Sequence, residues 1–488
     1  MIVLATIIAY SLILMVLGRM AGGRGNDEFF RGGRRSKWQL VAFGMIGASL
    51  SGVTFVSVPG MVVTSGMTYM QMCLGFILGY VVVAMVLMPL FYRYGLTSIY
   101  GWLGKRFGNE AQLTGAGFFL LSKLTGASAR LFLACAVLHD CVLAELHVPF
   151  FVTVMGTLAL MWLYTRRSGV RTLVWTDAFQ TLCLMVALLM VLTGVVNRLG
   201  IGWDDAFEAV MSDERSRMFV FDDWKSTQYF WKQFLSGAFV VVAMTGLDQD
   251  MMQKNLTCKS LKDAQKSLCS YGLMFAPVNF LFMSLGLLLV MLYDKIGMPL
   301  PANPDSILPL MVAEGHLGEW VMVFFALGIV SSAFSSADSA MTALTTSICV
   351  DVIKVENSGN RLFNDRERVR KVVHMCVAIA FVILILMYKG IGNGSVIDLI
   401  YRLASYTYGP LLGLFAFGWA TRRMPCGRMV PVVAVKSPVV CLVMDYLTKC
   451  FWGYAFGYEL LMFNAFFTLV ALWMISKNTK NGRRVSAW

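Results

Sequence analysis

Charged residues are scarce in this chain. Only 14% of its 488 residues are Asp, Glu, Lys or Arg, whereas 58% are hydrophobic. In a soluble globular protein about a quarter of the residues are charged, so this composition excludes an ordinary water-soluble fold. Apolar runs of about 20 residues, the length that crosses a bilayer as a helix, recur from one end of the chain to the other. We therefore predict an all-α polytopic membrane protein. Continuous runs argue against a β-barrel, whose strands alternate apolar and polar residues.

Several kinds of chemical site are also missing from the sequence. The eleven cysteines include no CxxC pair, and the four histidines show no metal-ligand spacing. There is no glycine-rich phosphate loop and no His/Asp/Glu cluster. We therefore expect neither an enzyme nor an organic cofactor. The net charge of +13 could suggest nucleic acid, but the basic residues lie in short loops between apolar runs. Neither nucleic acid nor an obligate protein partner is expected.

The apolar runs predict about thirteen membrane spans. Their ranges are near 1–19, 38–62, 68–92, 112–140, 148–165, 173–197, 229–250, 268–293, 317–350, 372–390, 395–421, 429–448 and 457–476. We interpret the first run as a retained helix rather than a signal peptide, because basic residues follow it instead of preceding it.

Basic residues crowd every second connection between these spans. The groups are Arg31, Arg34, Arg35 and Lys37; Arg93, Lys105 and Arg106; Arg166, Arg167 and Arg171; Lys254, Lys259, Lys262 and Lys266; Arg361, Arg366, Arg368, Arg370 and Lys371; Arg422, Arg423 and Arg428; Arg483 and Arg484. Basic loops stay in the cytoplasm. The pattern therefore predicts an external N-terminus, a cytoplasmic C-terminus and a location in the plasma membrane, with a bacterial inner membrane as the leading case.

Two of the predicted spans carry signals of interruption. The second contains GASLSGVT, from Gly47 to Thr54, and the seventh contains AMTGLDQD, from Ala243 to Asp250. Glycine and short polar side chains weaken a helix, and unwound backbone at membrane depth is tolerated only beside protein or a water-filled cavity. The two spans are five apart and cross in opposite directions. This spacing favours two inverted five-helix repeats, which are typical of transporters with sites at the midplane.

Five stretches, in the same order along the chain, resemble the sodium:solute symporter family: FFRGGRRSKWQLVAFGMIGASLSG (29–52), SVPGMVVTSG (57–66), VWTDAFQ (174–180), GLDQDMMQKNLTCKSLKDAQKS (246–267) and SSADSAMTALTTSICVDV (335–352). The resemblance implies a leucine-transporter-like five-plus-five inverted repeat. We accordingly expect an extra N-terminal helix and basic loop over 1–37. A transport core would follow over 38–423, with repeats 38–197 and 229–423, and two C-terminal helices with a short tail over 424–488.

The resemblance also implies a principal sodium site between the broken second span and the ninth span. Carried over residue by residue, its ligands are the backbone carbonyls of Gly47 and Leu50, the backbone of Ser332, and the hydroxyls of Ser335 and Ser336. Oxygen ligands suit a hard cation such as Na+, and carbonyls of an unwound helix can supply them. An alternative from the residues alone is that the small side chains only let two helices approach closely.

Some members of the family have a second sodium site, and its positions match Asp177, Ser335, Asp338 and Ser339. Asp338 lies about 18 Å inside the predicted end of its helix, a depth at which an ionisable group is a functional candidate. An internal ion pair is the alternative for Asp338. We expect Asp177 in the first turn of the sixth span, where the helix dipole alone would also stabilise an acid.

The solute is expected beside the break in the second span, where Ser49, Ser51 and Thr54 present hydroxyls. Gln71 is a further candidate for lining the same cavity. Helix ends at such a break favour an anionic group on the solute. Position 244 is Met, whereas relatives that carry sugars have an aromatic residue there. This difference argues against a sugar as the solute.

Arg130 lies in the interior of the fourth predicted span. A guanidinium there is costly unless it is paired, and it binds carboxylates with two hydrogen bonds. In relatives that transport sialic acid, an arginine of this helix holds the solute carboxylate, and Arg130 matches its position. A structural ion pair with Asp177 or Asp338 is the alternative.

These features predict a sodium-coupled secondary symporter that imports a small organic solute by alternating access. A carboxylate-bearing solute is favoured, with sialic acid as the first candidate and Na+ as the transported coupling ion. The expected partners are this solute and the lipid bilayer. A symporter for a neutral sugar, polyol or amino acid is the main alternative, and a transporter-like sensor or a membrane-embedded enzyme is less favoured.

Overall fold

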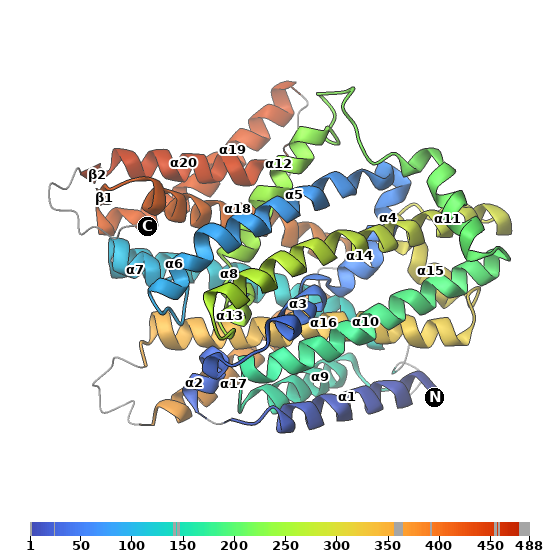
Figure 1. Ribbon diagram of the computed structural model, residues 1–488, viewed down its shortest axis with the longest axis horizontal. Coiled ribbons are helices and arrows are strands. Elements are labelled where there is room, and N and C mark those ends of the chain that lie inside the picture. Colours follow the sequence, from blue (N-terminus) through green and yellow to red (C-terminus); the bar gives the residue numbers. More distant parts are fainter. Residues whose placement is uncertain are drawn as a thin grey trace.

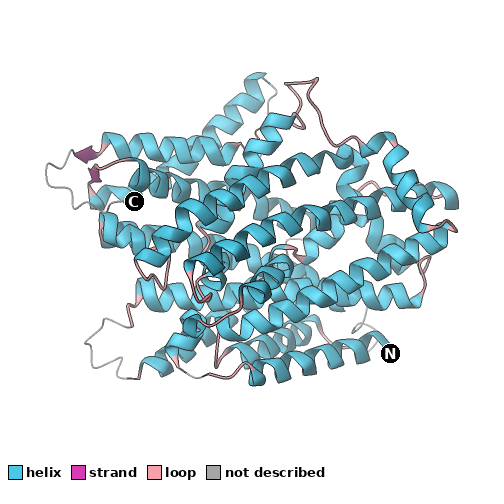
Figure 2. Cartoon of the chain, viewed as in Figure 1, coloured by secondary structure: helices cyan, strands magenta, loops and turns pink. Residues whose placement is uncertain are grey.

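The protein is a bundle of helices that run mostly along one long axis (Figure 1), and helix dominates the chain (Figure 2). The computed structural model describes residues 2–23, 25–139, 143, 147–355, 365–390, 393–452, 456 and 459–477. Within this part, β1 (Met424–Pro425) and β2 (Ser476–Lys477) pair antiparallel. The basic residues Arg361, Arg483 and Arg484 lie outside the described residues.

Twenty α-helices are assigned in the described part of the chain. They are α1 (Ile2–Met20), α2 (Asn26–Arg31), α3 (Trp38–Ser49), α4 (Gly52–Ser65), α5 (Tyr69–Val82), α6 (Met88–Arg93), α7 (Gly101–Phe107), α8 (Asn109–Leu138), α9 (Phe150–Thr165), α10 (Val170–Leu199), α11 (Trp203–Ser212), α12 (Phe230–Val241), α13 (Gln249–Asn255), α14 (Leu261–Ile296), α15 (Ile307–Ala313), α16 (Glu319–Ser347), α17 (Arg366–Lys389), α18 (Asn393–Ala420), α19 (Val430–Trp452) and α20 (Leu460–Met474).

The positions of the helices agree with the predicted spans, but the number of membrane-spanning helices does not. Each of the thirteen predicted ranges contains a helix or a pair of helices. Within the described residues, eight helices are long and apolar enough to cross a membrane, or nine if a bent pair counts as one span. The helices α3, α9 and α20 are apolar but shorter. A polytopic helical membrane protein is therefore confirmed, whereas the count of thirteen spans is not.

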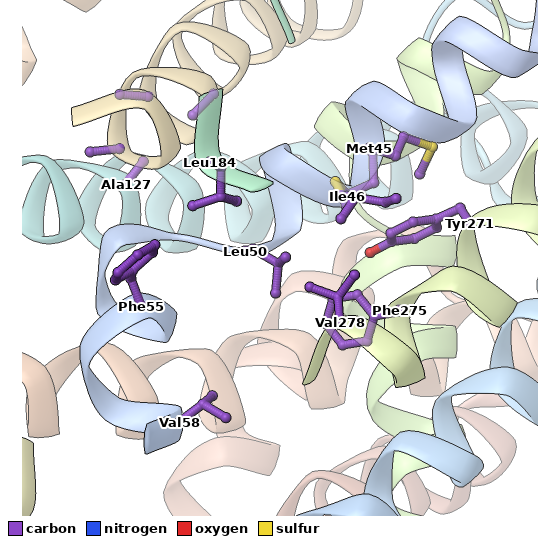
Figure 3. Packing of buried hydrophobic residues seen from close by; sticks show 14 of the residues in the cluster. Met45, Ile46, Leu50, Phe55, Val58, Ala127, Leu184, Tyr271, Phe275 and Val278 are labelled. Carbon is purple, nitrogen blue, oxygen red and sulfur yellow. The ribbon is translucent and has the colours of Figure 1, made fainter. Parts of the chain in front are cut away.

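The predicted break in the second span is confirmed. Helix α3 ends at Ser49 and α4 begins at Gly52, while Leu50 and Ser51 between them have extended backbone. Leu50 points from this segment toward α14, which carries Phe275 and Val278 (Figure 3). Its fully buried side chain anchors the unwound segment in the apolar core.

The predicted break in the seventh span is also confirmed. A π-helical turn, Val242–Gly246, ends α12, and the chain then bends by 74° into α13. Asp248 starts α13 because its carboxylate accepts hydrogen bonds from the backbone N–H groups of Asp250 and Met251. All seven residues of α13 are buried, so this short helix returns into the protein rather than into solvent.

Close packing fixes the first break against α10. A Cβ atom on Gly44 would lie 2.9 Å from the Cβ of Asp177, and one on Gly47 would lie 2.3 Å from Thr181 Oγ1. Glycine at both positions lets the two backbones meet. Helix α10 also packs along α16. The unwound segment, Asp177 and the hydroxyl-rich face of α16 are thereby brought together.

Candidate functional site

A cavity of about 270 Å³ lies between the two broken helices. Its polar lining combines hydroxyls, carboxylates and basic groups: Ser49, Ser51, Thr54, Ser57, Tyr80, Lys123, Arg130, Thr245, Asp248, Asp250, Tyr271, Ser336 and Tyr408. Its apolar lining includes Val58, Phe76, Met244 and Phe275. Of the predicted solute-binding residues, Ser49, Ser51, Thr54 and Arg130 therefore share one cavity. Binding cavities for small molecules typically combine apolar walls with a few placed polar groups.

Lys123 and two carboxylates form an ion cluster in the wall of the cavity. Lys123 Nζ lies 2.8 Å from Asp250 Oδ2 and 3.1 Å from Asp248 Oδ2. The hydroxyl of Tyr408 donates a 2.6 Å hydrogen bond to the same oxygen of Asp248. The three ionic side chains are less than a tenth exposed. The cluster therefore ties α8 to the start of α13 and to α18, and it neutralises much of its own charge.

Arg130 carries a second positive charge in the cavity wall. Its side chain is half-buried, and its Nε atom is buried without a hydrogen-bond partner. Among the described residues, no carboxylate lies within 4.0 Å of its guanidinium. The pairing with Asp177 or Asp338 that the sequence left open is therefore not formed. Arg130 therefore lines the cavity without an acidic partner among the described residues.

The predicted principal sodium ligands lie on the two sides of one helix contact. Ser336 Oγ on α16 donates a 3.2 Å hydrogen bond to the carbonyl of Ala48 at the end of α3. The helical backbone hydrogen bonds of α3 end with the one from Leu50 N to Ile46 O. In the described residues, they resume after the break with the one from Phe55 N to Ser51 O. The carbonyls of Gly47 and Leu50 therefore lack helical N–H partners beside α16.

The hydroxyls of Ser335 and Ser332 bond to protein groups, but this concerns the predicted ligand atom at Ser335 alone, because Ser332 is predicted to bind through its backbone. Ser335 Oγ donates a 2.8 Å hydrogen bond to Asp177 Oδ1, and Ser332 Oγ bonds to the carbonyl of Ile329 in its own helix. Ser332 lies beside Gly52 at the break, since a Cβ on Gly52 would lie 3.5 Å from Ser332 Oγ, and Ser335 contacts α10 through Asp177. Ser335 thus stands between the two predicted cation sites.

The residues predicted for a second sodium ion also gather on α10 and α16. Asp338 Oδ2 accepts a 2.6 Å hydrogen bond from the hydroxyl of Tyr164. Asp338 Oδ1 and the hydroxyl of Ser339 are buried without a partner in the described part of the chain. Unpaired buried oxygens are costly, so these atoms mark a place that could hold a cation or water.

Lys254 contacts the same group of residues. Its Nζ atom lies 2.8 Å from Asp177 Oδ2 and 4.0 Å from Asp250 Oδ1, and its side chain is only 3% exposed. The sequence placed Lys254 among the basic residues of a cytoplasmic loop, which is wrong because α13 carries it into the interior. Asp250, one helical turn earlier in the same segment, was the available signal.

Two further predictions are corrected by the structure. Helix α10 begins at Val170, so Asp177 lies two turns inside it rather than in its first turn, and its side chain is 1% exposed. Gln71 is buried away from the solute cavity. It bonds to the backbone carbonyl of Gln228 (2.9 Å) and accepts from Val220 N (3.0 Å). It therefore fastens the connection before α12.

Thr181 and Tyr271 support the break and were missed in the sequence. Thr181 Oγ1 accepts a 3.0 Å hydrogen bond from the backbone N–H of Gly47, and the Tyr271 hydroxyl bonds to Ser49 Oγ. Both lie far from the break in sequence, on α10 and α14, inside apolar stretches. No local pattern distinguishes such residues from ordinary core positions.

One family model matches most of the chain. Residues 29–426 match the family model described as the sodium:solute symporter family. The chain is 24% identical to the human sodium/iodide cotransporter over 84% of its own length and 64% of that protein. It is 24% identical to sodium-coupled monocarboxylate transporter 2 of Danio rerio over 88% of this chain and 66% of that one. The chain thus spans less than two thirds of the length of these two relatives.

A bacterial relative matches along most of both chains. The sodium/sialic acid symporter NanT of Aliivibrio fischeri is 24% identical over 88% of this chain and 84% of its own. Among solved structures, a substrate-bound, outward-open Na+-coupled sialic acid symporter superposes with a TM-score of 0.81. It covers 98% of this chain and 99% of its own at 18% identity. A nucleobase-cation-symport-1 family transporter gives a TM-score of 0.55, at 15% identity and with 91% and 92% coverage. These likenesses establish a fold shared with cation-coupled transporters.

Proposed function

Because this chain belongs to the sodium:solute symporter family, we propose that it imports a small carboxylate-bearing solute together with Na+. The observation that carries the choice of solute is the Arg130 guanidinium, which lines the cavity and has no carboxylate within 4.0 Å among the described residues. Lys123, the other basic residue of the lining, already contacts Asp248 and Asp250. A guanidinium that is half-desolvated and unpaired binds a planar carboxylate with two charge-assisted hydrogen bonds.

The names of the relatives support an anionic solute. Iodide, monocarboxylates and sialic acid are the solutes in those names, and all three are anions. Sialic acid is our first candidate, because its many hydroxyls match the hydroxyl-rich lining at Ser49, Ser51, Thr54 and Ser57. A small monocarboxylate would use Arg130 but make few contacts with these hydroxyls.

The principal sodium ion is placed in this proposal between α3 and α16. The carbonyls of Gly47 and Leu50, the backbone of Ser332 and the hydroxyls of Ser335 and Ser336 are its ligands. Support comes from the carbonyls that the break leaves without helical partners and from the contact of Ser336 with Ala48. Oxygen ligands of this kind replace the water shell of a hard cation.

A second sodium ion is proposed at Asp177, Ser335, Asp338 and Ser339. The hydrogen bond from Ser335 to Asp177 and the unpaired oxygens of Asp338 and Ser339 support it. Lys254 holds Asp177 in the structure, so Na+ has to share or replace that contact.

Transport in this proposal follows alternating access by two repeats, 38–197 and 229–423. The segment 1–37 precedes them, and 424–488 follows. Each repeat begins with a broken helix whose ends meet the cavity, so a rocking motion can expose the same site to either side. We propose an external N-terminus and a cytoplasmic C-terminus, in the plasma membrane and most simply a bacterial inner membrane, from the distribution of basic loops.

The proposal is tested by uptake into proteoliposomes. Labelled sialic acid, lactate, proline and glucose are offered separately, with either an inward Na+ gradient or an equal choline gradient. Uptake of sialic acid that requires the Na+ gradient is expected. Equal uptake in choline would contradict sodium coupling, and uptake of glucose or proline alone would favour the neutral-solute alternative.

Arg130→Ala tests the contact with the solute, and Arg130→Lys is the matched control. Removing one partner of a buried charge pair costs about 2–5 kcal/mol, which is about 30-fold or more in KM. Arg130→Lys keeps the charge without the bidentate geometry, so an intermediate KM is expected. Carboxylate uptake that is undiminished in Arg130→Ala would contradict the assignment.

A further inference from the structure

A small hollow lies between the ends of α1 and α9, apart from the solute cavity. It has a volume of about 70 Å³, and its side-chain lining comprises Met15, Arg19, Leu163, Tyr164, Arg166 and Arg167. Gly18 lines it as well and brings the helices together, since a Cβ there would lie 2.9 Å from Tyr164 Cβ. The two helices run side by side along one edge of the molecule (Figure 1).

Within the described part of the chain, the three arginines of the hollow lack acidic partners. No carboxylate of the described residues lies within 4.0 Å of Arg19, Arg166 or Arg167. By contrast, Arg171 nearby in the chain lies 2.7 Å from Glu28. Arg166 is half-buried, and its guanidinium stacks 4.8 Å from the ring centre of Trp162. Three unpaired guanidinium groups around one hollow attract an anion with several oxygen atoms.

The hollow adjoins an apolar surface. On α1, the side chains of Leu12, Val16 and Met20 are 58%, 52% and 75% exposed, and Leu163 of α9 is 37% exposed. Helix α1 is one of those apolar and long enough to span a membrane. Its exposed face is therefore one that lipid chains would cover, and the arginines stand where that face ends. A free anion would use the arginines alone, whereas a lipid uses both features.

We propose that this hollow binds the phosphate-bearing headgroup of an anionic phospholipid, with the acyl chains along α1. Basic hollows between membrane helices, at the boundary of the bilayer, suit such headgroups because charge and apolar contact act together. The inference does not depend on the transported solute, since none of these six side chains lines the solute cavity.

The test measures lipid retention by the purified full-length protein, using native mass spectrometry. Phosphatidylglycerol and phosphatidylcholine with identical chains are titrated against the wild type and Arg19→Gln/Arg166→Gln/Arg167→Gln. The matched control is Arg422→Gln/Arg423→Gln/Arg428→Gln, which removes the same charge elsewhere; Arg423 likewise stacks on a tryptophan, Trp473. Each basic residue near a membrane surface contributes about 1 kcal/mol to the binding of an anionic lipid. Phosphatidylglycerol should therefore bind about 100-fold more weakly to the variant of the hollow, and not to the control variant.

A second variant separates the hollow from its charge. Met15→Trp fills the hollow and keeps all three arginines, and we expect it to lose phosphatidylglycerol as well. Equal affinity in the hollow and control variants would overturn the proposal, as would equal binding of phosphatidylcholine. Displacement of the lipid by millimolar inorganic phosphate would also overturn it, since the hollow would then be a free-anion site. Thermal unfolding checks that each variant is folded, and sodium-driven uptake is recorded separately.

Discussion

Lys254 occupies the carboxylate at which the second sodium ion is proposed to bind. The ammonium of Lys254 lies 2.8 Å from Asp177 Oδ2, and both side chains are at most 3% exposed. Breaking a buried ion pair by removing one partner costs about 3–5 kcal/mol, because the remaining charge is left without compensation. A dissolved cation that enters the site can recover part of this cost.

Lys254→Met should therefore make the stability of the protein depend on Na+. We expect its melting temperature to fall sharply in choline chloride and to recover in sodium chloride at the same ionic strength. Lys254→Arg keeps the charge and should show a small difference between the two salts, as the wild type does. Thermal unfolding in detergent measures all three proteins. An equal fall in both salts would count against a cation site at Asp177.

Gln71 illustrates a polar residue whose role is structural. Its side-chain amide donates to the carbonyl of Gln228 and accepts from the N–H of Val220, and it is fully buried. Gln71→Ala leaves these backbone groups unpaired, at about 1–3 kcal/mol for each buried group. We expect a lower melting temperature and an unchanged KM for the solute. Thr54→Ala, at a residue that lines the cavity, should raise KM instead. A KM increase of similar size in both variants would instead support a role of Gln71 in solute binding.

At the scale of elements, the breaks in α3–α4 and α12–α13 could be predicted because their causes are local. Glycine and short hydroxyl residues weaken helix hydrogen bonding wherever they cluster, and Asp248 caps the helix that follows it within the same segment. The partners of Asp177 and Gln71 could not be predicted in this way. Lys254 is far from Asp177 along the chain, and Val220 is far from Gln71, so only the tertiary fold joins them.

Helix starts were predicted less well than helix interiors. Hydropathy placed the start of the sixth span near residue 173, whereas α10 begins at Val170 after Gly169, whose φ is +46°. A shift of a few residues is enough to move Asp177 from the first turn into the core. Ser49 of α3, Arg130 of α8 and Ser336 of α16 line one cavity in the structure, whereas their roles in binding stay predictions. Their detailed hydrogen bonds depend on side-chain packing that no motif encodes.

The approach of α3 to α10 gives a prediction for the first break. A methyl group in Gly47→Ala would lie 2.3 Å from Thr181 Oγ1 and 3.1 Å from Thr181 Cα, so the helices have to separate. We expect the Na+ concentration for half-maximal uptake to rise, because the carbonyls proposed as sodium ligands move with the backbone. Gly117→Ala is the matched control, since a Cβ there has no neighbour within 4 Å. The same Na+ dependence in both variants would argue against a sodium site at this break.

For the whole molecule, the balance of buried charge bears on how many ions move. Around the cavity and the proposed second site, the described residues supply the carboxylates Asp177, Asp248, Asp250 and Asp338, and the ammonium groups of Lys123 and Lys254. The carboxylates outnumber the lysines, and Arg130 is proposed to face a solute of opposite charge. This excess of carboxylates favours the cation binding that is proposed here, and in the proposed cycle each Na+ carried inward moves one charge across the membrane.

The ion count predicts a dependence on membrane potential. With one Na+ and a singly charged carboxylate, transport is electroneutral, whereas a second Na+ adds one net positive charge in each cycle. The potential contributes about 2.3 kcal/mol per charge at 100 mV, which is about 50-fold in solute accumulation.

We expect accumulation by the wild type to rise when a potassium diffusion potential makes the vesicle interior negative. Asp338→Asn, which removes one carboxylate of the second site, should retain uptake driven by the Na+ gradient but lose this response. A wild type that is insensitive to potential would limit the cycle to one sodium ion, and the role of Asp338 would then be confined to its hydrogen bond with Tyr164.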